Sequence, residues 1–199
     1  MKITLYEYGP TRSQRARWAL LEAGLEYESV EGRELIHSDE LRKVHPLGKV
    51  PAAVFDGKPL FESAAICTYI ADLVPEKKLI AASGTWERAL HDQWVAFALS
   101  ELEAFLWHSA RNQFVLPEDK RLTNVFEQNA EAFSVAAVAM ERALTDQDYL
   151  VGNRFSVTDI VVGFTVNWAR GMGLLKPFPN LRAYVARLFE RPHCTLTQG

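Results

Sequence analysis

The sequence predicts an α/β domain followed by an all-helical domain. Within residues 1–78, strand-like apolar runs occur between stretches in which apolar residues have helical spacing. From residue 86 onward, apolar residues repeat at the three- and four-residue spacing of helices. A linker that contains Ala81-Ala-Ser-Gly-Thr separates the two parts. We therefore expect domains at 1–78 and 86–199, joined by a linker at 79–85.

The first domain opens with a strand, a helix and a second strand. Residues 2–8 alternate as in a strand, and a helix is expected over 13–23, where Gly24 ends it. Residues 25–30 have the composition of a strand, which would follow the helix through a right-handed crossover. Ser38 is expected to cap a short helix over 39–44.

A hairpin and a helix complete this domain. Residues 52–55 form an apolar run, Asp56-Gly57 is the dipeptide favoured in two-residue turns with positive φ, and Leu60-Phe61 begins the return strand. A helix follows at once, with Glu62-Ser63 in its first turn. The resulting order, βαβ–α–ββα, resembles that of a thioredoxin-like domain.

The second domain is expected to contain four clear helices. Apolar residues stripe one long helix over 86–106 and another over 122–144, which opens near Pro117-Glu118. Residues 160–168 are apolar on nearly all sides, which predicts a central, buried helix. Ser156 and Asp159 at its start have the spacing of a capping box. A last helix is expected over 179–190.

Composition argues against several classes of function. The 199 residues carry a net charge of −3, so there is no global basic field to hold nucleic acid. Cys67 and Cys194, the only cysteines, lack metal-ligand spacing, so we expect neither a metal site nor a disulfide framework. The longest apolar run is far too short to span a membrane. We expect a cytoplasmic protein that binds no metal, nucleic acid or membrane.

The hairpin and the helix after it have the features of a peptide-binding site. Pro51 cannot donate to a strand ladder, and if the Val50-Pro51 bond is cis, Val50 turns its own N–H and C=O outward to a peptide backbone. Ser63 and the free amides at the helix start would bind a carboxylate, and Glu62 would bind an ammonium group. Glutathione has an amino-acid head group and a peptide bond further along, so it fits both positions.

The segment GKVPAAVFDGKPLFESAAICTYIAD resembles the glutathione-binding half of the cytosolic glutathione transferase superfamily. In that superfamily a Val/Ile-Pro pair, a hairpin and a Glu/Gln-Ser pair that opens a helix recur in this order. Gly152, Ser156 and Asp159 also match its G-x-x-x-S-x-x-D pattern, so the resemblance covers essentially the whole chain. It implies the glutathione transferase fold, with a thioredoxin-like N-terminal domain and an all-α C-terminal domain, and a homodimer.

The resemblance implies a hydroxyl group that stabilises the glutathione thiolate, because the thiolate is the nucleophile. Such a group would donate to the sulfur from between the first strand and the first helix. We rank Ser13 first, since it fits the Arg-Ser-x-Arg form of many bacterial members. Tyr8 ranks second, because tyrosine-using members place theirs at the end of the first strand. Thr11 ranks third, by counting back from Arg15-Ala16 as in serine-using members.

Further contacts are expected from position. Lys49 and His37 precede the Val50-Pro51 edge and would reach the glycine carboxylate of glutathione, while Arg12 would add positive potential near the thiolate. The second substrate would bind between the two domains, against the first long helix and the central helix. Candidate walls of that pocket are Trp107, His108, Arg111, Phe114, Trp168 and Met172.

The predicted function is that of a glutathione transferase, a detoxifying enzyme in which glutathione attacks a small hydrophobic electrophile. A glutathione-dependent isomerase, dehalogenase or peroxidase would use the same bound thiolate, so the sequence does not separate these reactions. A non-catalytic binding or scaffold protein on the same fold is the other alternative. Such proteins often lose the glutathione contacts, whereas Val50, Pro51, Glu62 and Ser63 are all present here.

Overall fold

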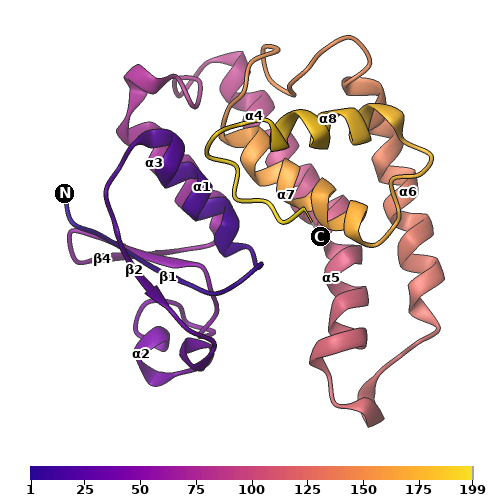
Figure 1. Cartoon of the computed structure of the whole chain (residues 1–199), viewed down its shortest axis with the longest axis horizontal. Helices are drawn as coiled ribbons and strands as arrows, with labels where there is room; N and C mark the ends of the chain where they lie inside the picture. Colours follow the sequence, from indigo (N-terminus) through magenta and orange to yellow (C-terminus); the bar gives the residue numbers. More distant parts are fainter. Residues whose placement is uncertain (199) are drawn as a thin grey trace.

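A four-stranded mixed sheet forms one side of the first domain in the computed structural model, which describes residues 1–198. The elements of this domain are β1 (Ile3–Glu7), α1 (Ser13–Ala23), β2 (Glu28–Glu31), η1 (Arg33–Leu35), α2 (Asp39–Arg42), β3 (Ala52–Phe55), β4 (Lys58–Phe61), α3 (Ser63–Leu73) and η2 (Pro75–Lys77). The strands lie in the order β2-β1-β3-β4, where only the pairing of β1 with β2 is parallel. Helices α1 and α3 pack together on one face of the sheet (Figure 1).

Local signals set most of these boundaries. Alternate residues of β1 are buried, as expected of a strand with one face against the core. The hairpin turn has positive φ at both Asp56 (48°) and Gly57 (82°), the geometry that twists in the same sense as the strands. β2 begins at Glu28 rather than at residue 25, because Leu25 and Tyr27 pack against the core and do not pair with β1.

The second domain is all-helical. Its elements are α4 (Trp86–Phe97), η3 (Ala98–Glu103), α5 (Ala104–Ala110), η4 (Arg111–Val115), η5 (Glu118–Lys120), α6 (Val125–Ala143), α7 (Val157–Gly171) and α8 (Pro179–Phe189). The first long helix is continuous over residues 86–115, but its segments η3 and η4 have the wider turns of a π-helix. Together α5 and α6 form a long pair that extends beyond the other helices (Figure 1).

The prediction that the second long helix opens near Pro117 is wrong. Residues 118–120 form a single 3₁₀ turn, and α6 begins only at Val125. Two side chains hold the connection in a non-helical path: Asn112 accepts a hydrogen bond from the backbone N–H of Leu122 (2.8 Å), and Arg121 donates to the carbonyl of Leu116 (2.8 Å). These contacts satisfy backbone groups that a helix would otherwise use.

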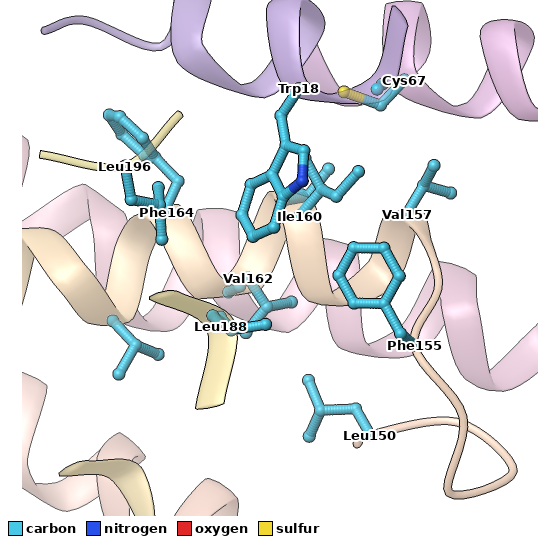
Figure 2. Close-up of a cluster of buried hydrophobic side chains, with 14 of the residues drawn as sticks. Trp18, Cys67, Leu150, Phe155, Val157, Ile160, Val162, Phe164, Leu188 and Leu196 are labelled. Carbon is cyan, nitrogen blue, oxygen red and sulfur yellow. The ribbon is translucent and has the colours of Figure 1, made fainter. Parts of the chain in front are cut away.

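Helix α7 is the central helix of the molecule, as its apolar sequence predicts. It contacts α1 and α3 of the first domain and α4 and α8 of the second. Trp18 of α1 points toward Ile160 of α7, and its ring centroid lies 5.6 Å from that of Phe155 (Figure 2). Because these side chains are buried together, one apolar core continues through both domains. The close approach of α8 requires Gly163, where a Cβ atom would lie 2.3 Å from a methyl group of Leu188.

The predicted capping box at the start of α7 is present. Ser156 accepts a hydrogen bond from the backbone, and the Asp159 carboxylate accepts one in return from the N–H of Ser156 (2.9 Å). Asp159 also accepts hydrogen bonds from the N–H of Leu150 (3.2 Å) and the hydroxyl of Tyr184 (3.0 Å). Burial raises the pKa of Asp159 to about 6, and the hydrogen bonds oppose that rise, so the carboxylate is ionised at neutral pH.

The last residues of the chain return to the first domain. Arg191 forms a two-pronged ion pair with Glu22 of α1 (2.8 Å for both N–O distances). Beyond it, Thr195 donates to the carbonyl of Gln14 (2.8 Å), and the Leu196 side chain is buried in the core. Figure 1 shows this segment in yellow, running from α8 toward α1. The C-terminal segment therefore helps to hold the two domains together.

No helix within residues 1–198 is both long enough and apolar enough to cross a membrane. Within the same range, the side chains of His, Cys, Asp and Glu form no group of three or more that would hold a metal ion.

Candidate functional site

A large open cleft lies between the two domains. The loop before α1, the residues around Pro51 and the start of α3 form its wall on the first domain. The wall on the second domain comes from the long helix over residues 86–115, from α7 and from the C-terminal segment. This cleft is the place where the sequence predicts that two substrates meet.

The predicted glutathione contacts all lie in this cleft. They are Arg12, His37, Lys49, Val50, Pro51, Glu62 and Ser63. The Val50-Pro51 peptide bond is cis, which is the condition stated from the sequence for an outward-facing Val50 backbone. Glu62 comes directly before α3 with φ at 70°, and Ser63 at the first position of α3 is 5% exposed. The free amides at this helix start add a partial positive charge, so the site suits a carboxylate next to an ammonium group.

His45 also lines this wall, although the sequence suggests no role for it. Its Nδ1 accepts a hydrogen bond from the N–H of Leu47 (3.0 Å), and its ring lies 5.1 Å from the ring of Phe61. Burial lowers the pKa of His45 and so favours the uncharged ring, whose contact with the N–H of Leu47 helps to hold the loop before Val50.

The three candidate hydroxyls are close together but differ in access to the cleft. Thr11 is half-buried and lines the cleft. Ser13, which ranks first from the sequence, is fully buried and does not line the cleft. Tyr8 is half-buried and does not line the cleft either. The Ser13 hydroxyl lies 3.0 Å from the Thr11 hydroxyl and accepts a hydrogen bond from the N–H of Tyr8 (3.3 Å). Ser13 therefore supports the loop from behind, and only Thr11 faces the space where a thiol would bind.

A buried ionic cluster lies directly behind the cleft. Arg15 of α1 is fully buried, and its guanidinium group pairs with Glu103 of the long helix. Arg15 also donates to the hydroxyl of Ser63 (3.2 Å) and to that of Thr165 on α7 (2.7 Å). The Thr165 hydroxyl in turn donates to Glu103 (2.6 Å). The cluster thus connects the start of α3 to both helices of the second domain that form the cleft.

Glu103 carries the negative charge of this cluster. Burial raises its pKa, but the charges of Arg15 and Arg12 outweigh that effect and lower the pKa to about 2. Arg12 reaches the other carboxylate oxygen through its Nε atom. Glu103 is not predicted from the sequence, because its partners Arg12 and Arg15 lie about 90 positions earlier in the chain and no local pattern marks such a pair.

Arg12 is held in the cleft by aromatic side chains as well as by Glu103. Its guanidinium carbon lies 5.0 Å from the ring centroid of Trp107 and 5.5 Å from that of Trp168. Within residues 1–198, neither Nη atom of Arg12 has a hydrogen-bond partner. Arg12 lines the cleft, so both of its Nη groups are available to a ligand there.

Most of the predicted walls of the electrophile pocket line the cleft. Trp107, Arg111 and Phe114 do so from the long helix, and Trp168 and Met172 from α7 and its end. The prediction that His108 lines the pocket is wrong. His108 lies outside the lining of the cleft, and its ring contacts Asn129 of α6 (3.3 Å). Successive residues of a helix point about 100° apart, and at this position the rotation turns His108 away from Trp107 and toward α6. Phe164 and the buried Arg15 also line the cleft, although the sequence predicts no role for either in the site.

Comparisons with known proteins show the family to which this chain is similar. The family model "Glutathione S-transferase, N-terminal domain" matches residues 1–72, and "Glutathione S-transferase, C-terminal domain" matches residues 100–192. Protein LigF of Sphingobium sp. (strain NBRC 103272 / SYK-6) is 30% identical, in an alignment that covers 96% of this chain and 91% of that protein.

Solved structures of glutathione transferases share the fold of this chain. A ternary complex of BphK, a bacterial GST, superposes with a TM-score of 0.86 at 29% identity, covering 96% of this chain and 95% of that one. The structure of a sphingomonad glutathione S-transferase complexed with glutathione has a TM-score of 0.83 at 28% identity, covering 96% and 94%.

Proposed function

Because this chain belongs to the cytosolic glutathione transferase superfamily, we propose that it is a glutathione transferase that joins glutathione to a small hydrophobic electrophile. The observation that carries the proposal is the cleft itself. One wall combines Val50, Glu62 and Ser63, which suit glutathione, with Thr11. The opposite wall supplies aromatic side chains for a second substrate.

Glutathione is proposed to lie along the wall of the first domain. Its γ-glutamyl carboxylate would accept hydrogen bonds from Ser63 and the amides of α3, and its ammonium group would pair with Glu62. The peptide group of its cysteine would pair with the backbone of Val50, whose N–H and C=O make no loop hydrogen bond within residues 1–198. Lys49 and His37 would bind the glycine carboxylate. This pose directs the sulfur toward the loop before α1.

We propose Thr11 as the group that stabilises the thiolate, in place of Ser13. In the free protein the Thr11 hydroxyl donates to the carbonyl of Tyr8 (2.7 Å), so it must rotate to donate to the sulfur. The neighbouring Ser13 hydroxyl and the N–H of Ser13 (3.2 Å) contact Thr11 and restrict its position. The positive charge of Arg12 would favour the thiolate further.

The pKa of the bound thiol, read from thiolate absorbance across pH, tests this assignment. In Thr11→Val, which keeps the shape of the side chain, the pKa of the bound thiol should rise by about one unit or more, because a hydrogen bond to a charged group contributes about 1.5–3 kcal/mol. Thr11→Ser should keep the wild-type value, and Tyr8→Phe should leave it unchanged. A rise in Ser13→Ala but not in Thr11→Val would assign the role to Ser13.

No binding of glutathione at millimolar concentration would contradict the transferase function itself.

We further propose that the protein acts in the cytoplasm as a homodimer and that its reaction detoxifies reactive compounds. Phe61 and Tyr69 support the dimer, because each is 41% exposed on the first domain, where a partner subunit would cover them. The same bound thiolate would also serve an isomerase, dehalogenase or peroxidase, and the substrate decides among these reactions.

A further inference from the structure

Given the proposed function, we infer that the preferred second substrate is an anionic aromatic electrophile, such as one with a carboxylate on its ring. The ring would pack against Trp107 and Trp168, and the carboxylate would pair with Arg12 and Arg111. This inference rests on three observations on the cleft: the free N–H groups of Arg12, the position of Arg111, and the charge balance of the lining.

Arg12 is prepared to bind an anion. Its Nε pairs with Glu103, which is 3% exposed, so this end of the guanidinium group is fixed. Both indole rings lie within about 6 Å of its guanidinium carbon, the range in which a cation and an aromatic face attract each other. The two Nη groups remain without partners in the described structure and form the planar fork that binds a carboxylate in two-pronged fashion.

Arg111 brings a second cation to the same aromatic wall. Arg111 lies four residues after Trp107 and three residues before Phe114, so the three side chains are neighbours along one face of the helix. All three line the cleft. The Arg111 side chain is exposed and has no hydrogen-bond or ion-pair partner within residues 1–198. A surface arginine beside aromatic side chains, without a carboxylate nearby to neutralise it, suits a ligand that is both flat and negatively charged.

The charge of the cleft exceeds what glutathione neutralises. The cations of Arg12, Arg15, Arg33, Lys49 and Arg111 line it together with the two carboxylates of Glu62 and Glu103, although the whole chain has a net charge of −3. Bound glutathione in its thiolate form has a charge of about −2, from two carboxylates, a thiolate and an ammonium group. An excess of positive charge therefore remains beside the aromatic wall, and an anionic electrophile would neutralise it.

In the inferred reaction, the glutathione thiolate attacks a ring carbon that carries a leaving group. The sulfur supplies the electron pair of the new carbon–sulfur bond, and the leaving group, a chloride ion for example, departs with the electron pair of the broken bond. The carboxylate takes no part in these bond changes. Its contribution is to place the ring, because Arg12 and Arg111 bind it before and during the attack.

Paired substrates test the inference. The substrates are 4-chloro-3,5-dinitrobenzoate and its methyl ester, which differ in charge but share the ring and the leaving group. We expect kcat/KM, divided by the uncatalysed rate constant of each compound, to be about tenfold higher for the carboxylate, which corresponds to about 1.4 kcal/mol. Added salt should reduce this preference. Equal normalised values for the two compounds would overturn the inference.

Charge variants locate the anion. Arg111→Gln should reduce the ratio of the two normalised values severalfold, and Arg111→Glu should reduce it further. Arg142→Gln is the matched control, since Arg142 is also exposed but lies on α6 outside the cleft lining, and the wild-type ratio should be kept. A ratio that Arg111→Glu leaves unchanged would contradict the role of Arg111.

Calorimetric binding separates failure of this inference from failure of the proposed function. Binding of S-methylglutathione tests the glutathione site alone. Binding of the unreactive 3,5-dinitrobenzoate and of its methyl ester then tests the second site, with and without S-methylglutathione. If S-methylglutathione does not bind, the proposed function fails, and tighter binding of the benzoate would still support the anionic site. If Arg111→Gln weakens S-methylglutathione instead of the benzoate, the arginine serves glutathione and the inference is wrong.

Discussion

At the scale of single residues, the Arg15–Glu103 pair is the interaction on which the cleft depends most directly. The Arg15 guanidinium contacts Ser63 at the proposed glutathione site and Glu103 behind the proposed electrophile site. It also donates to the carbonyl of Val161 (3.0 Å) and lies 4.6 Å from the ring centroid of Phe164. A charge so completely buried is tolerated only because each N–H group has a partner.

Replacing Glu103 by Gln should destabilise the protein strongly. The variant leaves Arg15 buried without a counter-charge, for which we expect a loss of about 3–5 kcal/mol in the free energy of unfolding. Urea denaturation at neutral pH measures this loss. Glu101→Gln is the control, because Glu101 is exposed two positions earlier in the same helix, and its effect should stay within about 0.5 kcal/mol. Similar midpoints for the two variants would contradict a central role for the pair.

The same pair has a defined pH dependence. The pKa of Glu103 is about 2 in the folded protein, below its ordinary value of 4.5. The stabilisation is therefore fully present above the ordinary value and is lost as the pH falls toward about 2, because the unfolded chain takes up the proton first. The difference in stability between wild type and Glu103→Gln should shrink across this acid range.

At the scale of elements, His91 connects three helices. It lies on α4, and its ring nitrogens contact the hydroxyls of Thr68 on α3 (3.1 Å) and Thr158 on α7 (2.9 Å). The side chain is 2% exposed. Burial lowers its pKa to about 4, with Asp92 opposing this effect and Arg88 adding to it. The neutral ring therefore joins the two domains at a position outside the cleft lining.

We expect His91 to reduce stability in mild acid. Between its ordinary pKa of 6.5 and about 4, the unfolded chain binds a proton that the folded protein does not, so the free energy of unfolding falls as the pH drops through this window. His91→Gln removes this contribution, so the stability difference between wild type and variant should decrease from pH 7 to pH 4. A constant difference for His91→Gln would refute the prediction.

The π-helical turns occur where the long helix carries Glu103 and Arg111, of which only Arg111 is predicted from the sequence. Glu103 ends the first of these segments and Arg111 begins the second, so each lies where the long helix departs from regular spacing. A wider turn changes the direction of every residue after it. The apolar stripe over 86–106 predicts a helix there correctly, but it does not predict which of the following side chains reach the cleft.

At the scale of the whole molecule, the C-terminal segment completes the fold. Gln14 of α1 donates through its side chain to the carbonyl of Thr195 and to the hydroxyl of Thr197 (2.9 Å for the second). Asn167 of α7 donates to the carbonyl of Thr197 (3.1 Å), which also lines the cleft. One short segment therefore contacts the first domain, the central helix and the site.

Leu196→Ala should destabilise both domains together. The side chain is 7% exposed within the shared core, so we expect a loss of about 2–5 kcal/mol in the free energy of unfolding. For a chain of this size, that corresponds to a fall of roughly 4–20 °C in Tm. Leu122→Ala, at a position that is 55% exposed, is the control and should have little effect.

Two spectroscopic probes show whether the domains unfold as one unit. Circular dichroism follows mainly the helical domain, and tryptophan fluorescence includes Trp18 of the first domain. Because one core and the C-terminal segment join the domains, the two transitions should coincide in Leu196→Ala as in the wild type. Separate transitions would show that the segment acts on one domain only.

The sequence alone determined the features that depend on near neighbours. The Asp56-Gly57 turn, the end of α1 at Gly24 and the capping box of Ser156 and Asp159 are each specified within a few residues. The same holds for the Val50-Pro51 edge and the Glu62-Ser63 pair. Only the hairpin of β3 and β4 separates them in the chain, and it brings them together in space. These short-range signals were enough to predict the fold class and the proposed glutathione wall.

Only the tertiary structure decided how distant residues combine. It buried Ser13 and left Thr11 facing the cleft, it directed Trp107 inward and His108 toward α6, and it joined Arg15 to Glu103. Each outcome depends on the packing of helices that lie far apart in the chain, and local preferences do not encode such packing. Burial and long-range charge pairing are properties of the assembled domains, and for this reason the chemistry of the cleft could not be assigned before its two walls were placed together.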